Sequence, residues 1–229
     1  MRRVGFALMW AVVPAKDLAG AKARLAHVLS AGERRRLFHA MLSDVLGALA
    51  EMTSLDGISL ITRDPAAKAL ALRFGAETIP EDENSGQTAA VAHGISRLMA
   101  RGVADIVQVP GDVPLATAGE FEQVIAAHLP APAMTIVPSR DQQGSNCVVC
   151  SPPDSVPLRF GDNSFFPHLD AARRGGIEPT ICALPGLGLD IDTPDDLAEL
   201  LARPGDTESH VYLAESGIAV RLQPERKSA

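Results

Sequence analysis

Residues 103–115 read Val-Ala-Asp-Ile-Val-Gln-Val-Pro-Gly-Asp-Val-Pro-Leu, and the rest of the chain is organised around them. The β-branched run Ile106, Val107 and Val109, ended by proline and glycine, predicts a buried strand. Asp112 follows at the carboxyl end of that strand, the end at which open parallel sheets bind ligands. A carboxylate between two prolines there suits a hard cation and its phosphate ligand. It suits a loop-capping turn aspartate equally well, so this stretch alone leaves both interpretations open.

The composition is that of a folded protein without a basic surface. Of the 229 residues, 46% are hydrophobic, which is ample for a core. We expect one domain over residues 1–229, with a tail of unclear role from residue 203. The formal net charge of −7 and the absence of a long basic run predict no nucleic-acid partner. No apolar run approaches the ~18 residues of a transmembrane helix, so we expect no membrane partner.

The amino-terminal residues 1–14 carry two arginines before an apolar run, as signal peptides do. However, Lys16 follows Pro14-Ala15 directly, no small-x-small cleavage site precedes it, and the run alternates as a strand does. We therefore predict a strand over residues 6–13 and a cytoplasmic protein.

Three cysteines, an odd number, argue against a disulfide framework. Cys147 and Cys150 form a C-x-x-C pair, which occurs in zinc and redox sites. They lie in an apolar, strand-like run, however, and no second pair completes a zinc site. We expect both to be buried structural residues.

Strand-like and helix-like segments alternate along the chain, which predicts an α/β fold with one mostly parallel twisted sheet and helices on both faces. Apolar periodicity and turn residues place strands at 6–13, 57–62, 76–80, 103–109, 134–138, 146–150 and 177–184. Similar signals place helices at 30–52, 65–74, 85–99, 117–129, 164–174 and from 193 onward. Capping boxes are expected at Ser30 with Glu33, Thr117 with Glu120, and Thr193 with Asp196.

Three cations, Lys16, Lys22 and Arg24, fall in a loop of small residues after the first strand. Such a cluster suits a polyanion such as a triphosphate, but it also suits a solvated charged turn. No G-x-x-x-x-G-K-[ST] or G-x-G-x-x-G motif occurs in this loop. P-loop and dinucleotide-binding interpretations therefore lose their main support.

Three polar turns are candidates for ligand contacts. Ser85-Gly86-Gln87 enters a helix with Ser85 as its expected N-cap, where a base edge or a phosphate can bind. Gly144-Ser145-Asn146 and the turn from Gly161 to Ser164 offer hydroxyl and amide groups beside glycine, which suit carboxylate or phosphate oxygens. Ordinary capped loops and turns have the same composition. His168, in the helix that we expect Ser164 to cap, is interpreted as structural.

Two aspartates, Asp190 and Asp192, precede the last well-marked helix, which begins at Thr193-Pro194. In an extended segment, residues two apart point to one side. The sequence shows no cation beside them that would neutralise the two carboxylates. We therefore expect a metal ion there.

Together these residues resemble the guanylyltransferases that activate a small phospho-acid for the deazaflavin coenzyme F(420). This is the CofC and FbiD group of nucleotidyltransferases, whose fold is glycosyltransferase-A-like. Four signatures in order, over about residues 6–200, carry the resemblance. They are Val13-Pro14-Ala15-Lys16 with Lys22-Ala23-Arg24-Leu25; Pro110-Gly111-Asp112-Val113-Pro114-Leu115; Gly144-Ser145-Asn146 with Phe160-Gly161-Asp162-Asn163-Ser164; and Leu189-Asp190-Ile191-Asp192-Thr193-Pro194-Asp195-Asp196-Leu197.

The resemblance implies an enzyme that transfers GMP from GTP to the phosphate of phosphoenolpyruvate, 2-phospho-L-lactate or 3-phosphoglycerate and releases pyrophosphate. It also implies hand-over of the labile product to the next enzyme of the pathway. The residues so implied are Asp112, Lys16 and Lys22 for catalysis; Asp112, Asp190 and Asp192 for Mg²⁺; Pro14, Ala15, Lys16, Lys22, Arg24, Ser85, Gly86 and Gln87 for the nucleotide; and Ser145, Gly161 and Ser164 for the phospho-acid.

Two alternatives stay open. One is a nucleotidyltransferase for another acceptor, such as a molybdopterin cytidylyltransferase, although those usually carry a glycine-rich loop where this chain has Pro14-Ala15-Lys16. The other is a non-catalytic nucleotide-binding protein of the same fold, which the three intact acidic positions disfavour.

Overall fold

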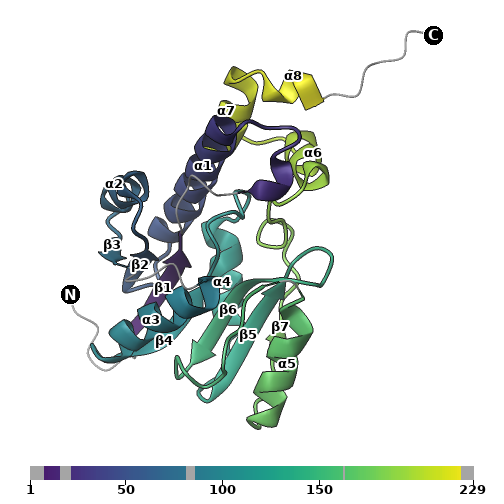
Figure 1. Ribbon diagram of the computed structural model, residues 1–229. Helices are drawn as coiled ribbons and strands as arrows, with labels where there is room; N and C mark the ends of the chain where they lie inside the picture. Colours follow the sequence, from purple (N-terminus) through teal and green to yellow (C-terminus); the bar gives the residue numbers. More distant parts are fainter. Residues whose placement is uncertain (1–7, 16–21, 81–85, 162, 223–229) are drawn as a thin grey trace.

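A single mixed sheet forms the centre of the computed structural model, which describes residues 8–15, 22–80, 86–161 and 163–222 (Figure 1). The strands of this described part are β1 (Leu8–Pro14), β2 (Gly57–Ile61), β3 (Glu77–Ile79), β4 (Val103–Gln108), β5 (Ala133–Pro138), β6 (Ser145–Ser151) and β7 (Thr180–Ile181). They lie in the order β3-β2-β1-β4-β6-β5-β7.

The sheet is mostly parallel, as predicted, and its one reversal matters for the site. Strand β6 runs antiparallel to both β4 and β5, whereas β1, β2, β3 and β4 pair in parallel and β7 pairs in parallel with β5. The reversal brings the beginning of β6 to the edge at which the other central strands end, because Ser145 pairs with Pro138 at the end of β5.

Helices cover both faces of this sheet, as predicted (Figure 1). One core packs under α1, α2, α4, α6, α7 and α8, and the other packs under α3 and α5. The bounds are α1 (Ala31–Ala50), α2 (Pro65–Arg73), α3 (Gln87–Met99), α4 (Ala118–Ala126), α5 (Phe165–Arg174), α6 (Pro194–Ala202), α7 (Glu208–Glu215) and α8 (Ile218–Leu222), with a 3₁₀ turn at Ala23–Leu25.

The alternation of side chains along each strand explains the two cores. Val107 of β4 packs in the first core, whereas Ile106 packs in the second. Cys147 and Cys150, three positions apart on β6, likewise lie in opposite cores and are both free thiols. The two sulfurs of the C-x-x-C pair therefore cannot share a metal ion, and the prediction of buried structural cysteines is confirmed.

Two of the three expected capping boxes are present. Ser30 with Glu33 begins α1, and Thr193 with Asp196 begins α6 after Pro194 at the first turn. The third is incomplete, since Thr117 accepts the Glu120 N–H but the Glu120 carboxylate bonds elsewhere.

Other local expectations need correction. The N-cap of α3 is Gly86, with φ 98°, rather than Ser85, which lies outside the described residues. Ser164 does occupy the N-cap of α5, but its hydroxyl makes no capping bond among the described residues. The strand expected at residues 177–184 is reduced to Thr180–Ile181.

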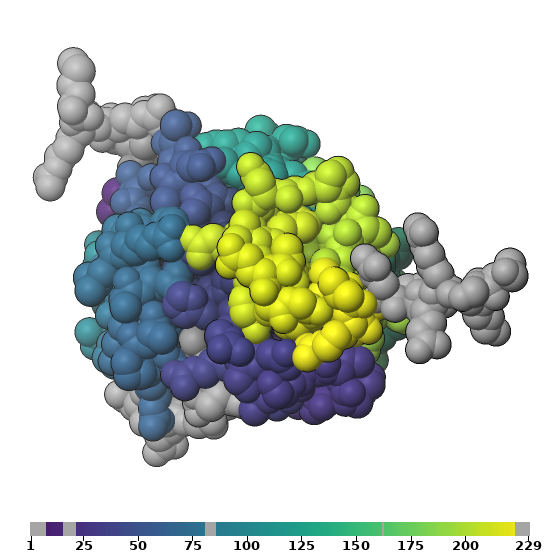
Figure 2. All heavy atoms as spheres, turned by 90° about the horizontal axis from the view of Figure 1, so that it is seen from above, coloured from purple at the N-terminus to yellow at the C-terminus, as the bar shows by residue number. Residues whose placement is uncertain are grey.

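The described part of the tail after residue 203 packs on α1. The Asp44 carboxylate of α1 accepts the N–H groups of Glu208 and Ser209 and the Ser209 hydroxyl. Leu213 of α7 and Ile218 of α8 are fully buried in the first core. Figure 2 shows α7 and α8 in yellow against the purple and blue segment that contains α1. This part of the tail therefore shares a core with the rest of the molecule.

Candidate active site

A polar pocket of about 410 Å³ opens at the edge where β1, β4 and β5 end and β6 begins. This is also where strand order reverses between β1 and β4, the usual ligand position in open α/β sheets. The predicted site residues that line the pocket are Arg24, Gln87, Asp112, Ser145, Gly161, Ser164, Asp190 and Asp192.

Of the remaining predicted residues, four belong to the described part of the chain and two do not. Pro14 and Ala15 are buried at the end of β1, Gly86 begins α3 beside Gln87 of the pocket lining, and Lys22 reaches the pocket carboxylates. Lys16 and Ser85 lie outside the described residues.

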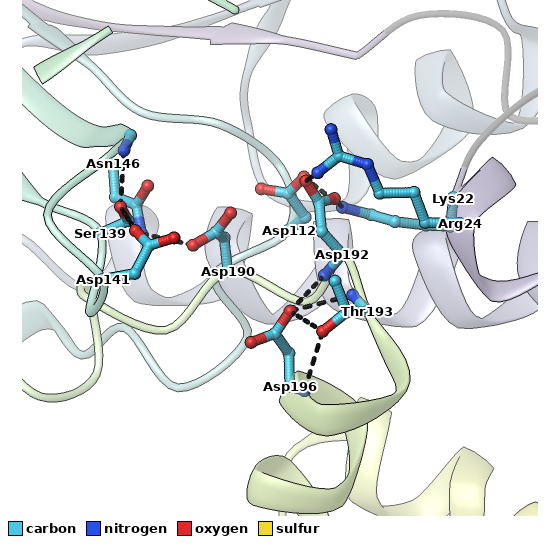
Figure 3. A network of polar contacts seen from close by, with 11 residues as sticks. Lys22, Arg24, Asp112, Ser139, Asp141, Asn146, Asp190, Asp192, Thr193 and Asp196 are labelled. Atoms are coloured by element: carbon cyan, nitrogen blue, oxygen red, sulfur yellow. Dashed lines mark hydrogen bonds and ion pairs between the residues drawn. The ribbon is translucent and has the colours of Figure 1, made fainter. Parts of the chain in front are cut away.

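Lys22 bridges two pocket carboxylates (Figure 3). Its Nζ donates to Asp112 Oδ2 at 2.5 Å and to Asp192 Oδ1 at 2.6 Å, and only 5% of its side chain is exposed. Burial alone would lower the pKa of Lys22, but the two carboxylates outweigh burial and raise that pKa above its usual value. The expectation that the Asp190–Asp192 pair has no cation beside it is therefore wrong.

A backbone hydrogen bond holds Asp112 in place, and one of its two carboxylate oxygens has no hydrogen-bond partner among the described residues. Its carbonyl accepts the Ile191 N–H at 3.0 Å, which joins the end of β4 to the segment that carries the two aspartates. Its Oδ1 is buried and has no hydrogen-bond partner among the described residues. At the preceding Gly111 a Cβ would lie 2.9 Å from Leu42 Cδ1 of α1, so close packing against α1 favours glycine at this position.

Asp190 and Asp192 both reach the pocket, but they have different partners. Asp190 accepts the side-chain amide of Asn146 at 3.1 Å, on the opposite side of Asp112 from Lys22 in Figure 3. Burial and the negative charge of Asp112 raise the pKa of Asp190 to about 6. Burial also opposes ionisation of Asp192, but Lys22 outweighs it and lowers the pKa of Asp192.

Two residues that position these aspartates were missed from the sequence. The buried Glu120 carboxylate of α4 accepts the N–H groups of Gly186 and Leu187, each at 2.8 Å. Asn146 donates to the Leu187 carbonyl at 3.0 Å as well as to Asp190. The sequence analysis had noted the Asn146 amide only as part of a turn that suits carboxylate or phosphate oxygens, and the capping pattern around Glu120 pointed to a different role.

The two turns that carry Ser145 and Ser164 meet in the lining of the same pocket. Ser164 Oγ donates to Ser145 Oγ at 3.2 Å, and both serines are buried except for their contact with the pocket. Gly161, with φ 143°, lies in the same lining, in a backbone conformation that favours glycine. The structure thus brings together the three residues predicted to bind the phospho-acid.

Arg140, which the sequence analysis did not single out, lines the pocket as a second cation in addition to Arg24. It pairs with Asp196 at 3.1 Å and with Glu199 at 3.5 Å. Arg24 lies 3.8 Å from Asp192. The pocket therefore holds cations next to carboxylates, which is the charge pattern that phosphates and a divalent cation need together.

No three His, Cys, Asp or Glu side chains of the described residues form a ready-made metal cluster. The metal role of Asp112, Asp190 and Asp192 stays a prediction. No helix in the described ranges is both long and apolar enough to cross a membrane.

The sheet, with carboxylates and cations gathered at its switch-point edge, has the fold of the nucleotidyltransferases. A crystal structure from Desulfovibrio desulfuricans G20, named as a nucleotide-diphospho-sugar transferase, matches the fold with a TM-score of 0.75 over 94% of this chain and 98% of that one, at 16% identity. That likeness concerns the fold.

The sequence comparisons identify the family. The family model described as "Guanylyl transferase CofC like" matches residues 9–229, and the chain belongs to that family of nucleotidyltransferases. The phosphoenolpyruvate guanylyltransferase of Roseiflexus castenholzii is 38% identical over 87% of this chain and 90% of its own length. That of Conexibacter woesei is 33% identical over 83% and 86%.

Proposed function

We propose that this guanylyltransferase transfers GMP from GTP to the phosphate of phosphoenolpyruvate, in the biosynthesis of coenzyme F(420). The names of its relatives support phosphoenolpyruvate over 2-phospho-L-lactate and 3-phosphoglycerate. The observation that carries the proposal is that one pocket is lined both by Asp112 and Asp192, which Lys22 bridges, and by the Ser145 and Ser164 hydroxyls.

The cationic end of the pocket is the proposed nucleotide site. Lys22 and Arg24, with Lys16 of the same loop, would neutralise the triphosphate beside Pro14 and Ala15 at the end of β1. The amino terminus of α3, formed by Gly86 and Gln87 after Ser85, would lie near the guanine. Lys22 would offset the charge repulsion that opposes the approach of a second anion to the α-phosphate, and Asp112 would help to hold a metal ion there.

The carboxylates fit a magnesium ion. Asp112 Oδ1 is a buried oxygen without a hydrogen-bond partner among the described residues. The Asp192 carboxylate lies close to Asp112, since both accept a hydrogen bond from Lys22 Nζ. Mg²⁺ in proteins commonly has one or two carboxylates, with phosphates and water as its other ligands. Asp112 and Asp192 would hold it, with Asp190 beside them; when bound, it would neutralise developing phosphate charge.

The hydroxyl end of the pocket is the proposed acceptor site. Ser145, Ser164 and the backbone at Gly161 offer neutral donors to the phospho-acid. The acceptor phosphate, with a second pKa near ~6, is largely dianionic at neutral pH and needs no general base. One of its oxygens forms a bond to the α-phosphorus of GTP, the α–β bridging P–O bond breaks, and pyrophosphate leaves. The residues of this chain contribute by alignment and by charge neutralisation.

A pyrophosphate-release assay tests this proposal. GTP, ATP, CTP and UTP are each combined with phosphoenolpyruvate, 2-phospho-L-lactate or 3-phosphoglycerate in the presence of Mg²⁺. We expect release with GTP and phosphoenolpyruvate above all other pairs. Preference for CTP would favour the cytidylyltransferase alternative, and preference for another phospho-acid would overturn the acceptor. Binding of GTP without release for any acceptor would favour the non-catalytic alternative.

A further inference from the structure

His168 of α5 lies directly behind the proposed acceptor site. Its side chain is buried, with 1% of the residue exposed, and its ring forms a T-shaped pair with the Phe160 ring at a centroid distance of 5.2 Å. Both ring nitrogens have partners within hydrogen-bond distance, and one of these is Ser145 in the pocket lining. From the sequence, contact of His168 with substrate was weighed and a structural role was favoured.

The neighbours of His168 determine its tautomer. The backbone N–H of Arg159 donates to Nε2 at 2.8 Å, so Nε2 carries no proton. In a neutral imidazole the proton must then be on Nδ1, which lies 2.9 Å from Ser145 Oγ. Burial lowers the pKa of His168 to about 4, so the ring is neutral at pH 7. His168 therefore donates to the Ser145 hydroxyl.

This donation determines where the Ser145 proton points. A serine hydroxyl has one donor and two acceptor positions. Nδ1–H of His168 takes one acceptor position and the Ser164 hydroxyl takes the other. No other partner of the Ser145 hydroxyl is found among the described residues, and Ser145 lines the pocket. The Ser145 O–H is thus left to donate into the pocket.

We propose that His168 is a positioning residue: by donating from Nδ1, it holds the Ser145 hydroxyl with its proton toward an anionic oxygen of the acceptor. The proposal rests on the proposed function, which makes Ser145 and Ser164 the acceptor site. It adds that this donor is already oriented in the free enzyme, so that acceptor binding does not have to order it.

Variants at position 168 separate orientation from packing. His168→Leu keeps an apolar side chain but removes the donor, whereas His168→Asn places an amide N–H near the position of Nδ1. We expect the Leu variant to raise the KM for phosphoenolpyruvate by about tenfold, the effect of losing one hydrogen bond of ordinary strength. The KM for GTP should change less than twofold by the same reasoning, and the Asn variant should recover most of the acceptor affinity.

Ser145→Ala tests whether His168 acts through this hydroxyl. We expect His168→Leu to have no further effect on the acceptor KM when Ser145 is already alanine. His128 is a matched control, since it also contacts two hydroxyls, Thr135 at 2.9 Å and Ser151 at 2.8 Å, away from the pocket. His128→Leu should lower the melting temperature and leave both KM values unchanged.

Several results would overturn the proposal. His168→Leu could raise both KM values equally or change only the melting temperature, which would show a structural role. Additive effects in the Ser145→Ala background would show that His168 does not act through Ser145. If the Leu variant does not fold, His168→Gln replaces it, because its amide reaches toward Arg159 and leaves Ser145 without the donor. A wild-type enzyme that releases no pyrophosphate from GTP with any phospho-acid overturns both proposals, whereas failure of the His168 proposal alone leaves the wild type active.

Discussion

Lys22 and Asp192 are 170 positions apart in the chain, yet Lys22 Nζ lies 2.6 Å from Asp192 Oδ1. The same ammonium group binds Asp112, so one buried cation serves two carboxylates. Lys22 itself adopts the left-handed conformation, with φ 57°, at the start of the 3₁₀ turn. The carboxylates of this site are therefore partly neutralised by the protein itself, and removing one of them leaves a buried ammonium group short of a partner.

Asp192→Asn should destabilise the protein in the absence of Mg²⁺ and nucleotide. Lys22 loses a charged partner, and burial of its ammonium group is no longer fully compensated. The Asp192 side chain is 42% exposed, so solvent screening limits the expected loss to about 1–2 kcal/mol of unfolding free energy. Urea unfolding at pH 7 without added metal measures it.

Asp190→Asn is the matched comparison. Asp190 has no contact with Lys22 within salt-bridge distance in the described structure, and an asparagine oxygen can still accept from Asn146. Because burial and Asp112 already disfavour its ionised form, we expect metal-free stability to stay within about 0.5 kcal/mol of the wild type, as for ordinary substitutions. Equal losses of unfolding free energy in Asp190→Asn and Asp192→Asn would contradict the conclusion that Lys22 depends on Asp192 as its charged partner.

Asp112→Asn should reduce turnover by at least about a hundredfold, as loss of a charge-stabilising group in a reacting site does. Lys22 then loses one of its two carboxylate partners, as in Asp192→Asn, but the chain should still fold, because the Asp112 backbone carbonyl keeps its bond to Ile191. Pyrophosphate release over a range of Mg²⁺ concentrations measures the turnover, and circular dichroism checks the fold. Wild-type turnover in this variant would remove Asp112 from the catalytic residues.

Glu120→Ala should lower both stability and activity. It leaves the N–H groups of Gly186 and Leu187 without their buried acceptor, which costs about 1–3 kcal/mol. The segment that carries Asp190 and Asp192 then loses an anchor, so kcat should fall as well. Thermal melting and pyrophosphate release are measured on the same preparation.

Glu122→Ala is the control on the same helix. Glu122 also accepts two backbone N–H groups, those of Thr53 and Ser54, but it does not line the pocket. We expect a loss of stability with kcat unchanged. A parallel fall of kcat in both variants would mean that general destabilisation, and not the position of the aspartates, reduces activity.

Folding stability should depend on pH through His168. Its pKa is about 4 in the folded protein against 6.5 for an ordinary histidine, so between these values the unfolded chain binds more protons at this residue. Stability from this site is therefore fully present above pH 6.5 and is lost as pH falls toward 4. The slope is at most about 1.4 kcal/mol per pH unit.

Urea unfolding of the wild type and His168→Asn over this pH range checks the prediction. The stability difference between them should shift against the wild type by about 2–3 kcal/mol as pH falls across the window. Ser145→Ala keeps the histidine, so its unfolding free energy should change with pH in the same way as that of the wild type. Parallel curves for the wild type and His168→Asn would show that His168 titrates normally.

The sequence by itself determined the features that depend on near neighbours. The strand ended by Pro110 and Gly111, and the capping boxes of Ser30 with Glu33 and of Thr193 with Asp196, were predicted correctly. Each depends on residues a few positions apart, which the helical or extended backbone brings together in almost any context. Alternation of strands and helices likewise indicated the layered α/β fold before any contact was known.

Only the tertiary structure decided which polar groups meet. Glu120 fits a capping pattern, yet its carboxylate reaches Gly186 and Leu187, and Ser164 occupies a cap position, yet its hydroxyl bonds to Ser145. Lys22 looked like one of three loop cations and became the partner of Asp112. Such pairings follow from strand order and from the reversed direction of β6, which bring distant segments to one edge of the sheet. Once they meet there, a buried donor or charge bonds to the partner that packing supplies, because leaving it unpaired costs more than giving up a local bond.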